Sequence, residues 1–206
     1  MEIINGRDFV EFCGKKIDAN FHLEKELLIN YQKLYNYLFN PSESLRNGID
    51  PKKGLYLYGF PGSGKSFGLR VFRQMIIDSK LDVSNRFDIK NFKKIEREYD
   101  TDKSEIFDLY GKGLKSIIAF DETFLDISMT GSKYGGKKID LHAELFTDRH
   151  LSFIEDDIKT HTTTNVNIGF LEAEKIFDAR VIGRLDEMFN EIHWKGANLR
   201  KWVIIK

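Results

Sequence analysis

The sequence has little of what cross-links a chain or anchors it in a membrane. Its 206 residues include one cysteine, Cys13, and three prolines. A single cysteine excludes an internal disulfide and a cysteine-based metal site, which suits a reducing cytoplasm. No apolar run approaches the roughly 20 residues that a membrane helix needs, and the start MEIINGRDF lacks the basic-then-apolar order of a signal peptide. We therefore expect a cytoplasmic protein with no membrane partner.

Net charge is missing as well. Lysine plus arginine and aspartate plus glutamate number 32 each, so the molecule as a whole has no field that draws it onto nucleic acid. Any contact with DNA must therefore be local. The five histidines show no metal-ligand spacing, which argues against a histidine metal site. The length fits one globular domain.

What the chain does contain is an alternation of apolar runs and helical patterns, the order of a layered α/β domain. Leucines and tyrosines between 27 and 38 recur at three- and four-residue steps, which predicts an amphipathic helix that ends before Asn40-Pro41. The tail from 191 to 206 looks like two short strands around a turn. Further helices are predicted directly after the glycine-rich stretch 59–66, near 91–99, 104–111 and 139–151, and over 170–189. Strands are predicted at 55–58, 86–89, 116–120 and 158–164.

The strongest motif is GFPGSGKS, which lies between a predicted strand and a predicted helix. Its glycines let backbone N–H groups turn inward around a β-phosphate, and the helix N-terminus adds its dipole. Lys65 places a positive charge near the β- and γ-phosphates, and Ser66 ligates Mg²⁺. The structural alternative is a glycine-rich turn that happens to contain GKS. The nucleotide-binding residues predicted here are Gly59, Phe60, Pro61, Gly62, Ser63, Gly64, Lys65, Ser66 and Phe67.

An acidic pair, Asp121-Glu122, follows the apolar strand IIAF. A carboxylate at the carboxyl end of a parallel strand points into the crevice where ligands bind. Asp121 can then hold the metal through water, while Glu122 polarises an attacking water. A kinase of the P-loop class needs no such second acid, so the pair favours an ATPase. The alternative is an acidic pair that caps a helix.

Asn165 ends the stretch THTTTN at the close of the fourth predicted strand. A neutral amide between the P-loop and the acidic pair can orient the lytic water or contact the γ-phosphate without adding charge. Taken alone, Asn165 fits a turn at least as well, because Asn-x-Asn favours turns.

Arg180 and Arg184 lie one turn apart if DARVIGRL is helical, and like charges at that spacing repel. Something anionic should compensate for this repulsion. One candidate is an intramolecular carboxylate, Asp186 or Glu187. The other is a phosphate of ATP bound to a neighbouring subunit, with one arginine acting as a finger in trans.

These features, in this order, resemble an AAA+ ATPase, and more narrowly the DnaC-type helicase loaders and the related IstB-type transposition ATPases. The narrower resemblance rests on HAELFTDRHL with Asp148-Arg149, on THTTTNVN, and on FDARVIGRLDEMFNEIHWKGANLR with Gly196 and Arg200. It covers about residues 24 to 201. We therefore expect an ATPase domain at 24–206, preceded by a short extension, 1–23.

The resemblance implies a three-layer α/β P-loop fold with a five-stranded, mainly parallel sheet of order 5-1-4-3-2 and no helical lid. It implies Lys65 and Ser66 for ATP and Mg²⁺, with Asp121 and Glu122 as the Walker B pair. Asn165 would be sensor 1, and Arg184 the arginine finger with Arg180 as second candidate. The implied partners are further copies of the chain in a ring or spiral, single-stranded DNA, and a replicative helicase or a recombinase.

Three function classes remain open. The first is a helicase loader, in a minimal form from a phage or mobile element; the second is a transposition ATPase on duplex DNA; the third is a small-molecule kinase. The loop 128–138, with Lys133, Tyr134, Lys137 and Lys138, would either follow a DNA backbone or form a solvated surface loop. Trp194 and Trp202 are expected to pack the terminal strands.

Overall fold

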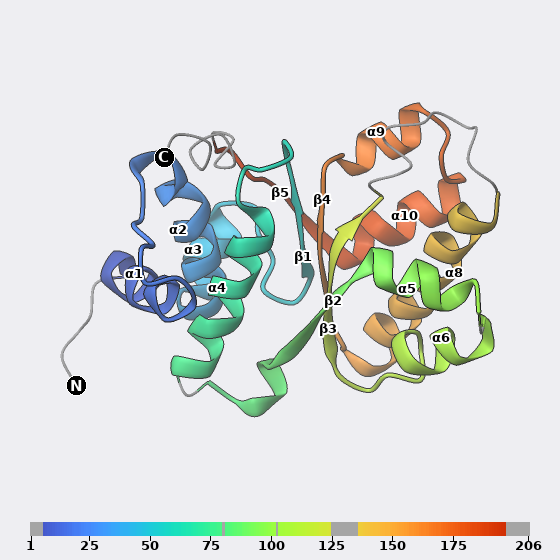
Figure 1. Ribbon diagram of the computed structural model, residues 1–206, viewed down its shortest axis with the longest axis horizontal. Coiled ribbons are helices and arrows are strands. Elements are labelled where there is room, and N and C mark those ends of the chain that lie inside the picture. Colours follow the sequence, from blue (N-terminus) through green and yellow to red (C-terminus); the bar gives the residue numbers. More distant parts are fainter. Residues whose placement is uncertain (1–5, 80, 102, 125–135, 197–206) are drawn as a thin grey trace. The chain divides into compact units, whose positions relative to one another are not determined.

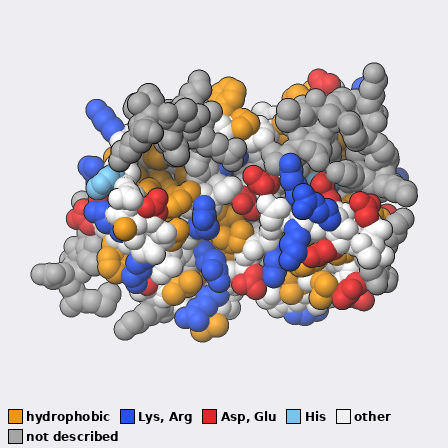
Figure 2. All heavy atoms as spheres, in the orientation of Figure 1, with side chains coloured by type: hydrophobic (Ala, Val, Ile, Leu, Met, Phe, Trp, Pro, Cys, Tyr) orange, Lys and Arg blue, Asp and Glu red, His pale blue; other side chains and the backbone are white. Residues whose placement is uncertain are grey.

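The chain forms two compact units, and Figure 1 traces it in a computed structural model that describes residues 6–79, 81–101, 103–124 and 136–196. Unit 1 consists of residues 1–51, 60–86 and 194–206, and unit 2 of residues 52–59 and 87–193. On the face visible in Figure 2, acidic and basic side chains are intermixed, as the zero net charge leads one to expect. No helix of the described residues is long and apolar enough to cross a membrane.

Unit 2 contains one parallel sheet of five strands, in the order β2-β3-β4-β1-β5. This confirms the predicted strand number and order. The first strand predicted in the tail is confirmed as part of β5, a parallel neighbour of β1 with His193 opposite Tyr58; residues 197–206, where the second strand was predicted, lie outside the described residues. The strands are β1 (Gly54–Tyr58), β2 (Phe87–Asn91), β3 (Ile117–Thr123), β4 (Thr160–Thr164) and β5 (Phe189–His193).

Helices cover one side of this sheet within unit 2, as Figure 1 shows for α5, α6, α8 and α10. The core between the two layers is aromatic, with Phe92, Phe120 and Phe146 almost fully buried. Ring contacts such as Phe120 on Phe146, 5.8 Å between centroids, fix the helices against the strands. The helices of unit 2 are α5 (Phe92–Tyr99), α6 (Lys103–Tyr110), α8 (Gly136–Asp156), α9 (Ile168–Ala173) and α10 (Ala179–Met188).

The single helical region predicted over 170–189 is wrong, because the chain forms α9 and α10 with a break between them. Asp178 is extended at the break, and its Oδ1 accepts the N–H groups of Arg180 and Val181 at 2.9 and 3.0 Å. These backbone donors lower the pKa of the Asp178 carboxyl. An N-cap of this kind starts a new helix, so α10 begins where the sequence offers an acid in front of its first turn.

Unit 1 is helical, and two of its helices were missed by the sequence analysis. Residues GRDFVEFCGKKI form a helix ahead of the first predicted one, and Lys16 Nζ contacts Asp78 Oδ1 at 2.6 Å. The helix predicted to stop before Asn40 does so, but Pro41 then opens a further short helix, since proline is well suited to the first helical position. The boundary at residue 24 stays a prediction. The helices are α1 (Gly6–Ile17), α2 (Lys25–Phe39), α3 (Pro41–Arg46) and α4 (Lys65–Asp78), followed by a 3₁₀ turn at Val83–Asn85.

The buried His161 of β4 makes the stability of unit 2 sensitive to acid. Its Nδ1 accepts the Leu55 N–H at 3.1 Å, its ring packs on Phe87, and burial lowers its pKa to about 3. The unfolded chain takes up this proton near pH 6.5 and the folded chain does not, so the stabilisation is complete above that pH. It is lost as the pH falls toward 3, by about 1.4 kcal/mol per pH unit.

We expect urea unfolding of the wild-type protein to show this loss between pH 7 and pH 5. His161→Asn, which keeps an acceptor for Leu55 but does not titrate, is expected to be less stable at pH 7 and to change less with pH. If the free energy of unfolding changed equally with pH in the two proteins, His161 would not be the group responsible.

Candidate functional site

The loop after β1 has the backbone of a phosphate cradle. Gly62 and Gly64 have φ angles of 82° and 91°, a left-handed region that side chains with a Cβ avoid. The Ser63 N–H turns back to the Phe60 carbonyl at 3.2 Å, and α4 begins at Lys65. Glycines here and a helix N-terminus directly after them leave backbone N–H groups to face an anion.

Lys65 and Ser63 are the buried polar residues of this loop in unit 1. Lys65 is 7% exposed, and its Nζ donates to the Phe60 carbonyl at 2.9 Å, which holds the ammonium across the loop. Ser63 is 1% exposed, and its Oγ has no hydrogen-bond partner among the described residues. A buried cation and an unpartnered buried hydroxyl beside a glycine cradle fit a phosphate-bearing ligand.

The remaining predicted loop residues differ in their exposure to solvent. Phe60 is 77% exposed, Pro61 is exposed, and Ser66 is half-buried in the first turn of α4. Phe67 packs on Phe21, with 5.1 Å between ring centroids. Phe67 therefore contributes to packing within unit 1.

The acidic pair lies within β3, which continues three residues beyond the predicted end of that strand. The Thr163 hydroxyl donates to Asp121 Oδ1 and also accepts the Glu122 N–H at 3.0 Å. The register of β3 against β4 shifts here, and Glu122 has a φ of 65°. One threonine of β4 thus binds the Asp121 carboxylate and the Glu122 backbone at the carboxyl end of the sheet.

Asn91 is a site residue that the sequence analysis missed. It ends β2, opposite Asp121, and its Nδ2 donates to Glu122 Oε2 at 2.9 Å. Its Oδ1 accepts the Lys94 N–H at 3.3 Å, which caps α5 and fixes the amide. The sequence signal was an Asn-Phe step between a strand and a helix, and only the pairing of β2 with β3 shows what the amide contacts.

Asn165 follows β4 directly and is half-exposed. Because β4 lies between β3 and β1, the parallel sheet brings Asn165 to the same edge as Asp121 and Glu122. These three residues therefore share one edge of unit 2. Lys65 and Ser66 belong to unit 1, and Gly59 is the loop residue that unit 2 contributes.

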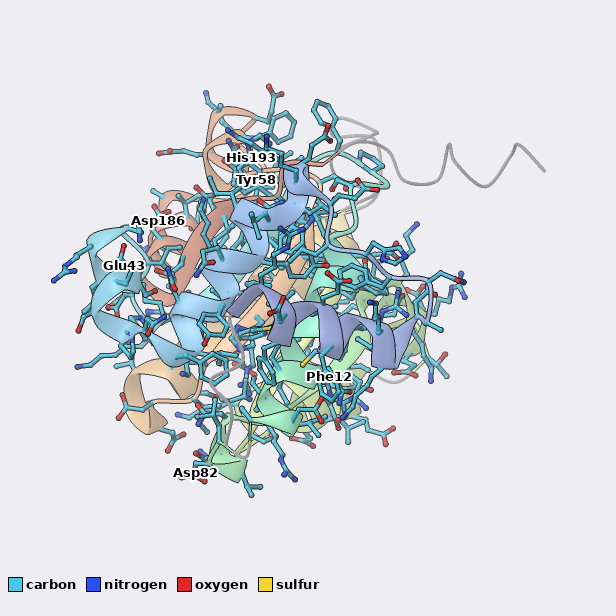
Figure 3. The ribbon with its side chains drawn as sticks, turned by 90° about the vertical axis from the view of Figure 1, so that its left-hand side faces the viewer. Phe12, Glu43, Tyr58, Asp82, Asp186 and His193 are labelled. Atoms are coloured by element: carbon cyan, nitrogen blue, oxygen red, sulfur yellow. The ribbon has the colours of Figure 1, made fainter. Side chains whose placement is uncertain are left out.

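The end of β1 is held by a ring stack. Tyr58, the residue before Gly59, lies on His193 of β5 with 5.0 Å between centroids and an interplanar angle of 11°, and Figure 3 shows the two side by side. Burial, together with the nearby Glu191 carboxylate, raises the pKa of the Tyr58 hydroxyl. The stack fixes the point at which the chain leaves the sheet for the glycine loop.

Arg180 and Arg184 both lie on α10, one turn apart as predicted. Arg184 Nη1 donates to the Thr147 hydroxyl of α8 at 2.8 Å, whereas Arg180 is exposed. The proposed intramolecular partner Glu187 instead contacts His150 at 2.8 Å. In the described part of the chain, Arg184 therefore has a neutral partner and no bonded carboxylate.

Lys133, Tyr134, Arg200 and Trp202 lie outside the described residues, as do the side chains of Lys137 and Lys138. Among the residues that are described, no cluster of histidine, cysteine and acidic side chains could hold a metal ion by itself.

No protein-family model and no curated protein sequence matches this chain. Solved structures do. The structure of DnaI aligns with a TM-score of 0.57 at 19% identity, covering 88% of this chain and 89% of that chain. The DnaC helicase loader aligns with a TM-score of 0.56 at 17% identity, covering 87% and 96%. Domain III of the Thermotoga maritima replication initiation protein DnaA gives 0.53 at 13% identity, covering 85% and 65%.

At these identities the likeness establishes the fold. It agrees with the sheet order of unit 2, and in the described residues no helical lid follows β5. The fold resemblance predicted from the motifs is thereby confirmed. The chain has the fold of the DnaC helicase loader, of DnaI and of domain III of DnaA.

Proposed function

We propose that this protein is a replication ATPase of the helicase-loader type. It binds ATP and Mg²⁺ at the loop from Gly59 to Ser66, and ATP joins its copies into a ring or spiral on single-stranded DNA. The observation that carries the proposal is the glycine cradle with the buried Lys65, in a chain that shares its fold with a helicase loader. Its target would be a replicative helicase.

The loop and the start of α4 hold the phosphates in this proposal. Backbone N–H groups around Gly62 and Gly64 face the β-phosphate, and Lys65 leaves the Phe60 carbonyl for the β- and γ-phosphates. Ser66 would hold Mg²⁺ directly, and Asp121 would hold it through water. The ion, when bound, neutralises the charge that develops on the transferred phosphoryl group.

Hydrolysis depends on the acids and amides of unit 2. Glu122 accepts a hydrogen bond from the attacking water, and Asn165 orients that water toward the γ-phosphate. Asn91 occupies one oxygen of Glu122 in the structure. This bond competes with the water for the carboxylate, so turnover is slow until a partner or neighbouring subunit displaces the amide.

Arg184 is the residue that would reach the ATP of the neighbouring subunit. In the single chain it is bonded to Thr147, a neutral group that a phosphate can outcompete. With ATP, Mg²⁺ and a single-stranded oligonucleotide present, we expect light scattering to give a molar mass several times the 24.0 kDa of one chain. Arg184→Ala should stay monomeric while retaining ATP binding.

Thr147→Val is the matched control, because it removes the partner and keeps the arginine. It should assemble at least as well as the wild-type protein. A mass that stays near 24.0 kDa under every condition rules out the contact in trans and makes the small-molecule kinase the next candidate. Assembly on duplex DNA in preference to single strands would favour the IstB-type function instead.

A further inference from the structure

The segment that follows β5, Trp194–Gly196, runs through unit 1 between α2 and the glycine loop, and we refer to it as the strap. The Trp194 indole N–H donates to the Ser63 carbonyl at 3.1 Å. On its other side, the Asn30 amide of α2 donates to the Lys195 carbonyl at 2.6 Å. A Cβ on Gly196 would lie 2.8 Å from the Ser63 carbonyl oxygen, so the strap touches the back of the loop.

The indole that makes this contact has little freedom. Trp194 is 1% exposed and meets Tyr31 of α2 edge-on, with 5.3 Å between ring centroids. On the α4 side it lies so close to Gly68 that any side chain there would overlap it. Helices α2 and α4 thus hold the donor rigidly in front of its acceptor.

The loop needs such an outside constraint. Ser63 stands between Gly62 and Gly64, two residues whose backbone has many accessible conformations. If the N–H groups of the loop are to face a phosphate, the Ser63 carbonyl must point away from that phosphate. That carbonyl belongs to a residue that is 1% exposed, so without the indole it would be buried and unpaired.

We propose that the strap preorganises the phosphate loop, with Trp194 as its positioning residue and Asn30 as the anchor of the strap on α2. This inference rests on the proposed nucleotide binding at that loop. Because coupling is reciprocal, a nucleotide in the loop also tightens the strap and α2. A nucleotide bound at the loop thereby affects α2 as well as the loop itself.

The first test is calorimetric titration with a non-hydrolysable ATP analogue and Mg²⁺. Trp194→Phe keeps an aromatic ring and loses the N–H, and Gly196→Ala crowds the Ser63 carbonyl. We expect each to weaken binding about tenfold, the effect of one hydrogen bond. Tyr37→Leu is the control, because it disturbs the packing of α2 on Phe72 without touching the loop; its affinity should change less than twofold.

The second test uses the wild-type contact. In Trp202→Phe protein the only indole N–H resonance left is that of Trp194, and it should shift on addition of the analogue but not in the Lys65→Ala variant. If the wild-type protein binds the analogue while Trp194→Phe binds equally well, or the resonance does not move, the strap inference is wrong and the proposed function stands. If the wild-type protein binds no nucleotide, the proposed function fails, and the strap inference with it.

Discussion

Replacing Arg149 by methionine is expected to lower the free energy of unfolding by about 3–5 kcal/mol, because each buried acceptor left unpaired costs about 1–3 kcal/mol. Arg149 of α8 has no exposed surface, and burial lowers its pKa to about 10. Its Nε donates to Thr160 Oγ1 at 2.9 Å, and its Nη1 to the Leu114 carbonyl at 2.9 Å. Methionine fills a similar volume but leaves these acceptors, together with the carbonyls of Gly111, Ser116 and Lys159, without their donor.

Urea unfolding followed by circular dichroism measures this loss. Arg149→Lys should be nearly as damaging, because an ammonium cannot reproduce the fork of donors. Lys112→Ala is the surface control; its exposed contact with Glu155 at 2.8 Å should contribute at most about 1 kcal/mol. If Arg149→Met lowered the free energy of unfolding by less than about 1 kcal/mol, the buried guanidinium would not be what joins α8 to β4.

Glu122→Gln should reduce ATP turnover about 100-fold or more while leaving ATP affinity unchanged. Glutamine keeps the shape and still accepts from Asn91, but it cannot hold a proton from the attacking water. Steady-state phosphate release and calorimetric titration measure the two quantities separately. If affinity falls together with turnover, Glu122 holds nucleotide or metal rather than water.

Asn91→Ala is the companion variant, since it leaves the carboxylate and removes its amide partner. Basal turnover should be maintained or rise, because both oxygens of Glu122 are then accessible to water. A loss as large as that of Glu122→Gln would mean that Asn91 orients the carboxylate productively, contrary to the role proposed for it.

The parts of the fold that could be predicted were those whose signal is local. The glycine loop carries its own turn chemistry, and the apolar run 117–120 reads as a buried strand whatever surrounds it. Helix α1 also has a local signal, because Val10, Cys13 and Gly14 share a buried face. It was missed because two glycines, Gly6 and Gly14, lie within it and weaken the helical pattern.

The contacts of the site could not be predicted because they cross between strands. That Thr163 bonds Asp121, and Asn91 bonds Glu122, follows from the order of β2, β3 and β4 and from a register shift. Neither is visible in a linear pattern. The strap was likewise hidden, since Trp194 was expected only to pack a strand, and its N–H reaches a loop 131 positions away.

The backbone at Glu122 has a consequence for laboratory evolution. Its φ of 65° places a residue with a Cβ in a region that costs about 1 kcal/mol or more, and glycine there would relieve that strain. A library screened only for heat resistance should therefore enrich glycine or asparagine at this position. With Glu122 in its proposed catalytic role, such a screen would yield proteins that resist heat but do not hydrolyse ATP, so thermostabilisation of this chain should keep codon 122 fixed.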